Sequence, residues 1–127
     1  MRRQRILRHV FKFHGLVESF KLAFAGVYYL FLYHRNMRII FMLGFMAMLM
    51  GRLFQLKGLE LAALCITVML VFMAEMFNTA IEMLMNIVTV KYHVRIKLVK
   101  DIAAAVVLLA ALNALAVGYV LFAKKIF

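Results

Sequence analysis

The sequence contains no proline and no tryptophan, and its six glycines are spread singly along the chain. Because proline and clustered glycines are the usual helix breakers, their absence favours long helices joined by short turns. The single cysteine, Cys65, cannot form a disulfide within the chain. No stretch has the composition of a flexible linker, so residues 1–127 are expected to form one domain.

Charged residues are also scarce. They make up 17% of the chain, whereas 68% of the residues are hydrophobic. A compact soluble domain of 127 residues has too little polar surface to cover so much apolar material. The apolar residues also come in long runs, notably 42–50, 61–74 and 102–122. The composition therefore excludes a soluble monomer and indicates an integral membrane protein.

Acidic residues are the scarcest charged type. Lysine and arginine number 16 and aspartate and glutamate only 5, which gives a formal net charge of +11. In a largely apolar chain with no soluble basic domain, this charge predicts contact with anionic lipid headgroups or nucleotide phosphates. Nucleic acid is not an expected partner.

The apolar pattern divides the chain into four helical segments. From about residue 5 to residue 33, basic side chains alternate with Phe, Leu and Val. This pattern is typical of an amphipathic helix lying on the membrane surface. Membrane spans are expected at about 39–54, 59–90 and 97–123. The 59–90 segment would measure about 48 Å as a helix, so about a third of it must project beyond the hydrocarbon core. The expected fold class is an all-α integral membrane protein with one surface helix and three transmembrane helices.

The distribution of basic residues predicts the orientation in the membrane. Residues 1–38 and 91–100 together contain twelve lysines and arginines. The opposite side of the membrane would have four, which are Arg52, Lys57, Lys124 and Lys125. The positive-inside rule therefore places the N-terminus and the turn at 91–100 in the cytoplasm.

Two of the five acidic residues lie in one polar stripe of the second span. Glu75, Asn78, Thr79 and Glu82 are spaced i, i+3, i+4 and i+7, which places them on one helix face, and Asn86 continues that face. Glu82 is expected at the cytoplasmic interface, with Glu75 deeper in the membrane. A carboxylate at that depth is costly, so it indicates a functional site.

The start of the third span has complementary charges. Lys97, Lys100 and Asp101 are expected at the same membrane boundary as Glu82. Carboxylates beside lysines suit Mg²⁺ bound to a polyphosphate, because oxygen ligands hold the ion and lysines offset the phosphate charge. A network of ion pairs between helices would use the same residues, and their spacing and charge leave both interpretations open.

Several segments together resemble the small prokaryotic diacylglycerol kinase and undecaprenol kinase family. The matching segments are EMFNTAIE at 75–82, Tyr92-His93, Lys97, KDIAA at 100–104, SFKLAFAG at 19–26 and RNMRI at 35–39. The resemblance extends from about residue 19 to 111. It implies a homotrimer of three-span subunits in the bacterial inner membrane. Each subunit would transfer the γ-phosphate of MgATP to a lipid alcohol, undecaprenol or diacylglycerol, at the cytoplasmic face.

The resemblance also implies roles for individual residues. By position, Glu75 would be the general base that takes the proton of the lipid hydroxyl, and Glu82 would be a ligand of the metal ion. Asn78 would help to order the site, and Lys100 and Asp101 would contact the nucleotide.

Two positions depart from the family pattern. His34 stands where the family has a metal-binding glutamate, and Asn86 stands where it has an aspartate. Histidine is a poor Mg²⁺ ligand and asparagine brings no charge, so the roles of both residues, and of Lys97, stay open.

Two main functions are therefore expected from the sequence. One is an active lipid kinase, and the other is a degenerate relative that acts as a non-enzymatic membrane scaffold. A small ion carrier that uses Glu75 and Glu82 is a third alternative, but it would leave the cytoplasmic lysines unexplained.

Overall fold

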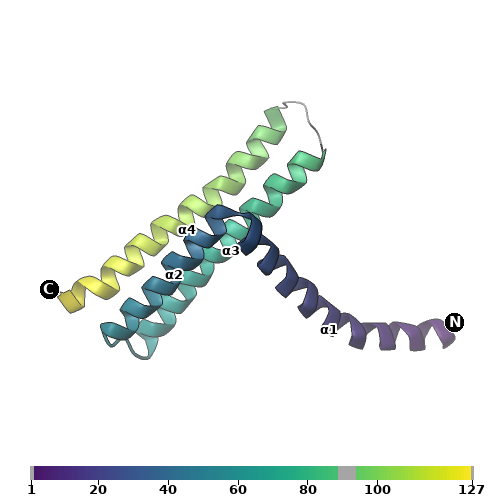
Figure 1. The fold of residues 1–127 in the computed structure, drawn as a ribbon, viewed down its shortest axis with the longest axis horizontal. Helices are drawn as coiled ribbons and strands as arrows, with labels where there is room; N and C mark the ends of the chain where they lie inside the picture. The colour runs from purple at the N-terminus through teal and green to yellow at the C-terminus, as the bar shows by residue number, and fades with distance from the viewer. Residues whose placement is uncertain (1, 89–93, 127) are drawn as a thin grey trace. The chain divides into compact units, whose positions relative to one another are not determined.

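The computed structural model describes residues 2–88 and 94–126, with side chains from residue 15 onward. Four helices lie within these ranges (Figure 1). They are α1 (Arg2–Tyr33), α2 (Arg35–Leu53), α3 (Leu59–Val88) and α4 (Val94–Ile126). No strand occurs in the described ranges, so the all-α prediction is confirmed.

The helices are longer than most of the apolar segments that predicted them. The first begins at Arg2 instead of about residue 5, α2 begins at Arg35 instead of 39, and α4 runs from Val94 to Ile126 instead of 97–123. Hydropathy marks only where the chain is apolar, whereas helical hydrogen bonding continues into charged residues until something interrupts it. The third helix begins at Leu59, as predicted, and residues 89–90 of that predicted span lie outside the described residues.

The chain forms two compact units, Met1–Arg35 and Asn36–Phe127. The first contains α1, whose last turns present exposed tyrosines. The ring centroids of Tyr29 and Tyr33 lie 4.8 Å apart. Tyrosines near the end of an apolar helix are typical of the membrane–water interface.

The second unit contains α2, α3 and α4, with a tight turn between α2 and α3 (Figure 1). The backbone N–H of Leu56 donates to the carbonyl of Gly51 at 2.9 Å, and that of Gln55 donates to Arg52 at 3.1 Å. Gln55 has a φ of 58°. These features form a Schellman cap, which satisfies the last carbonyls of α2. The cap turns Leu56 inward, where it is 4% exposed.

The core of this unit lies near the turn between α2 and α3. Buried Leu56, Leu64 and Leu121 form it, so it joins the turn to α3 and α4. Close approach of α2 and α3 depends on glycine, because a Cβ atom at Gly51 would lie 2.6 Å from Cδ2 of Leu64. Small residues at such contacts are typical of membrane helices, in which close packing is a main source of association.

The ends of α3 and α4 that flank residues 89–93 extend past the N-terminal end of α2 (Figure 1). This follows from helix length, since α3 has 30 residues and α2 has 19. At 1.5 Å per residue these are about 45 and about 28 Å. The projecting ends include Glu82, Asn86 and the first turns of α4.

All four helices are long and apolar enough to cross a membrane, including the Gly15–Tyr33 part of α1. The mean hydropathy is 1.3 for that segment and for α2, 2.0 for α3 and 2.4 for α4. Large apolar side chains are exposed on every helix, as is expected of surfaces that face lipid. The protein is an integral membrane protein, whereas the surface position of α1 stays a prediction.

Candidate active site

Glu75 lies on the face of α3 that packs within the second unit. It is 6% exposed, and its neighbours on that face, Thr67 and Thr79, are also buried. The hydroxyl of Thr79 donates to the backbone carbonyl of Glu75 at 2.9 Å. A carboxylate in an apolar helix bundle lowers stability unless polar groups or ligands compensate it. Glu75 is buried in this unit, and its functional role stays a prediction.

Asn78 lies one turn from Glu75 on the same side of α3. Its side chain is half-buried, and the Oδ1 atom is buried without a hydrogen-bond partner in the part of the chain that the structure describes. An unsatisfied buried acceptor costs about 1–3 kcal/mol. Asn78 therefore presents an oxygen that a cation or a ligand donor could satisfy.

Glu82 is exposed and lies one turn beyond Asn78. Among side chains 15–88 and 94–126, no three His, Cys, Asp or Glu residues form a metal-binding group. Mg²⁺ in nucleotide sites is held by one or two carboxylates, with phosphate and water oxygens as the other ligands. The oxygens of Glu82 and Asn78 fit that kind of site.

The projecting ends of α3 and α4 bring two predicted residues together. Lys100 Nζ donates to Oδ1 of Asn86 at 3.2 Å, which joins the two helices. Sequence reasoning missed this contact, because nothing in the sequence gives the register of α3 against α4.

Two other predicted site residues lie close together along α4. Lys97 Nζ lies 3.6 Å from a carboxylate oxygen of Asp101, and both side chains are 62% exposed. This pair lies within α4, so it is not the ion pair between helices that the sequence left open. Such an exposed pair adds less than about 1 kcal/mol of stability.

His34 belongs to the first unit and lies just after the end of α1. Its backbone N–H donates to the carbonyl of Leu30 at 2.9 Å. Its ring centroid lies 6.1 Å from that of Tyr29. The local contacts of His34 are therefore with the last turns of α1.

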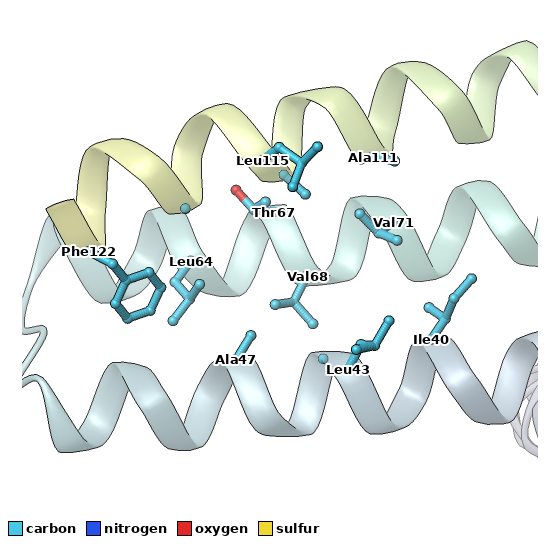
Figure 2. Close-up of a pocket in the computed structure, with 13 residues that line it drawn as sticks. Ile40, Leu43, Ala47, Leu64, Thr67, Val68, Val71, Ala111, Leu115 and Phe122 are labelled. Carbon is cyan, nitrogen blue, oxygen red and sulfur yellow. The ribbon is translucent and has the colours of Figure 1, made fainter.

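An apolar pocket of about 350 Å³ lies between α2, α3 and α4 (Figure 2). Thr67 is its polar lining residue, and the Thr67 hydroxyl already donates to the carbonyl of Ala63 at 2.7 Å. Val71, which also lines the pocket, precedes Glu75 by one turn on the same face of α3. Sequence reasoning missed the pocket, although a series of small residues on α4 leaves room for it: Ala111, Ala114 and Gly118.

The fold and these residues define an all-helical membrane protein with a buried carboxylate beside an apolar pocket and a polar helix end. The chain matches the model of the prokaryotic diacylglycerol kinase family over residues 21–122, and it belongs to that family. It is also 40% identical over 105 residues to a protein of Synechocystis sp. named diacylglycerol kinase. That match covers 82% of this chain and 60% of the relative, so the chain spans less than two thirds of the relative's length.

Proposed function

We propose that the protein is a lipid kinase that transfers the γ-phosphate of ATP to a membrane lipid alcohol, undecaprenol or diacylglycerol. Membership of the family and the name of the Synechocystis relative support this activity. The observation that supports it most strongly is the buried Glu75, because it lies between an apolar pocket and a group of polar residues on one helix.

The apolar pocket suits the hydrocarbon chain of the acceptor. It lies within the apolar segments of three helices, and its lining is almost free of polar groups. Because Val71 is one turn from Glu75, a chain in the pocket would place the lipid hydroxyl near the Glu75 carboxylate. This arrangement would use binding of the remote tail to orient the reacting oxygen.

In the proposed reaction, the lipid hydroxyl oxygen forms a bond to the γ-phosphorus of ATP. The bond between that phosphorus and the β–γ bridging oxygen breaks, and ADP leaves. Glu75 takes the hydroxyl proton as general base. Its buried position excludes water, which would otherwise compete as the acceptor.

The polar residues of α3 and α4 would bind the nucleotide. Glu82 and Asn78 would hold Mg²⁺ together with the phosphates, and bound Mg²⁺ would offset the negative charge of the phosphate oxygens. Lys100 would contact phosphate oxygens directly, and Asp101 would contact another part of the nucleotide. The exposure of Glu82 agrees with a nucleotide that arrives from water.

The proposed assembly is a homotrimer in the bacterial inner membrane with residues 1–127 as one domain, three spans and α1 on the cytoplasmic surface. Charge favours this arrangement over four spans. With α1 on the surface, the two sides have twelve and four basic residues. With α1 across the membrane, residues 2–12 move to the other side and Lys21 lies within the span, so that side has nine basic residues and the cytoplasmic side has six.

The alternative function is a degenerate family member that serves as a membrane scaffold. Histidine at position 34 and asparagine at position 86 favour it, because the family pattern has carboxylates there. A phosphate-transfer assay with labelled ATP, using diacylglycerol and undecaprenol in parallel mixed micelles, separates the two functions. Labelled lipid phosphate from either alcohol supports the kinase and identifies its acceptor, whereas no transfer to either alcohol supports the scaffold.

A further inference from the structure

The contact between Asn86 and Lys100 gives position 86 a role other than that of a lost metal ligand. Asn86 lies on α3 and Lys100 on α4, and the 3.2 Å hydrogen bond between their side chains joins the projecting ends of the two helices. Lysine has three donor hydrogens, so two remain for other acceptors once Asn86 has accepted one. This exposed contact therefore orients the ammonium without using all its hydrogen-bonding capacity.

The position of Asn86 on α3 fixes where this ammonium lies. Asn86 follows Glu82 by four residues, so the two side chains are neighbours on one helix face. An ammonium that donates to Asn86 is therefore held within about one helical turn of the Glu82 carboxylate. A phosphate group that shares Mg²⁺ with Glu82 would lie within reach of Lys100.

The chemistry of the amide matters as much as its position. The Lys97 ammonium lies against the carboxylate of Asp101, which offsets its charge. The partner of Lys100 at 3.2 Å is the neutral amide oxygen of Asn86, which orients the ammonium and leaves its charge in place. An aspartate at position 86 would instead form an ion pair with Lys100 and compete with phosphate for it.

We propose that Asn86 is a positioning residue that holds the Lys100 ammonium beside Glu82, with its charge available to nucleotide phosphates. This inference rests on the proposed function, because it assumes that Lys100 binds ATP. It predicts that the asparagine at this position supports nucleotide binding, and that restoring the family's aspartate weakens it.

Binding of a fluorescent, non-hydrolysable ATP analogue to the detergent-solubilised full-length protein tests the proposal without requiring turnover. Asn86→Ala should raise the Kd about fivefold, as is typical for the loss of one hydrogen bond, and Asn86→Asp should raise it at least as much. Lys100→Met should also raise the Kd. Adding Asn86→Ala to Lys100→Met should change nothing further, because the amide acts only through the ammonium.

Cys65→Ala serves as the matched control. It removes a different contact between helices, the one of 3.9 Å between Cys65 Sγ and Met48 Sδ, and should leave the Kd unchanged. In the phosphate-transfer assay, Asn86→Ala should raise the KM for ATP about fivefold with kcat within about twofold of wild type. A purely structural role for Asn86 would lower thermal stability without this selective change in KM.

Several results would overturn the proposal and distinguish it from failure of the kinase function. An unchanged Kd in Asn86→Ala or Lys100→Met, additive effects in the double variant, or tighter binding by Asn86→Asp would each contradict it, even if wild type transfers phosphate. Absence of analogue binding by wild type would contradict both proposals. Binding with the predicted pattern but without phosphate transfer would support the role of Asn86 and contradict the kinase.

Discussion

The hydroxyl of Thr79 donates a 2.9 Å hydrogen bond to the backbone carbonyl of Glu75, one turn earlier on α3, and both residues are buried. A threonine hydroxyl has one hydrogen to donate, so Thr79 cannot donate to the Glu75 carboxylate at the same time. Thr79 is therefore not needed to orient the proposed base. Thr79→Val is consequently a close control for substitutions of Glu75.

Glu82→Gln should weaken Mg²⁺ binding, because it removes the charge of the side chain. The protein should stay folded, because Glu82 is exposed. The Mg²⁺ concentration for half-maximal transfer should rise about tenfold, as is typical when a charged ligand is lost. Titration of Mg²⁺ at fixed ATP measures this. An unchanged Mg²⁺ requirement would show that Glu82 does not bind the metal ion.

His34→Glu restores the carboxylate that the family pattern has before Arg35 and Asn36. The added negative charge should lower the Mg²⁺ concentration for half-maximal transfer, because Mg²⁺ prefers oxygen ligands to imidazole. His34→Gln is the control, since it adds an oxygen without charge and should have a smaller effect. If His34→Glu leaves the Mg²⁺ requirement unchanged, position 34 is not part of the metal site in this protein.

Gly118→Leu should reduce acceptor binding. A Cβ atom at Gly118 would meet nothing within 4 Å, and Gly118 lines the apolar pocket, so a leucine would extend into the space proposed for the lipid chain. Excluding about two methylene groups of that chain costs about 1.6 kcal/mol, which corresponds to a KM for the lipid raised about tenfold. The KM for ATP should not change.

Ala116→Leu is the matched control for the pocket, because Ala116 is exposed on α4 and does not line it. It adds the same side chain and should leave the KM for the lipid at the wild-type value. Equal effects of Gly118→Leu and Ala116→Leu would contradict the assignment of the pocket to the acceptor.

The apolar runs predicted where the helices lie, but they could not predict how the helices pack. Leu59 begins α3 as expected, and Glu75, which was expected deeper than Glu82, is buried whereas Glu82 is exposed. The hydrogen bond between Lys100 and Asn86 depends on the register of two antiparallel helices, which packing determines. The cap of α2 could not be predicted from the sequence either. The residue with a positive φ in this cap is Gln55, whereas glycine usually occupies that position.

The position of α1 can be tested by labelling single cysteines in intact bacterial cells with a membrane-impermeant maleimide, in a Cys65→Ala background. Lys124→Cys should be labelled, whereas Arg3→Cys and Lys91→Cys should react only after permeabilisation. This pattern follows from a surface helix and from the twelve-to-four distribution of basic residues. Labelling of Arg3→Cys on the same side as Lys124→Cys would instead show that α1 crosses the membrane.

The most direct measurement is the rate of phosphate transfer to lipid by wild type, Glu75→Gln and Thr79→Val in mixed micelles. The size of the oligomer is measured for each variant, to show that the assembly is unchanged. Glutamine is nearly isosteric with glutamate but cannot take the hydroxyl proton, so Glu75→Gln should lower kcat by about 10²- to 10⁴-fold. Thr79→Val should stay within about threefold of wild type, because the Glu75 side chain is retained. Turnover by Glu75→Gln at the wild-type rate would contradict the role of Glu75 as the base.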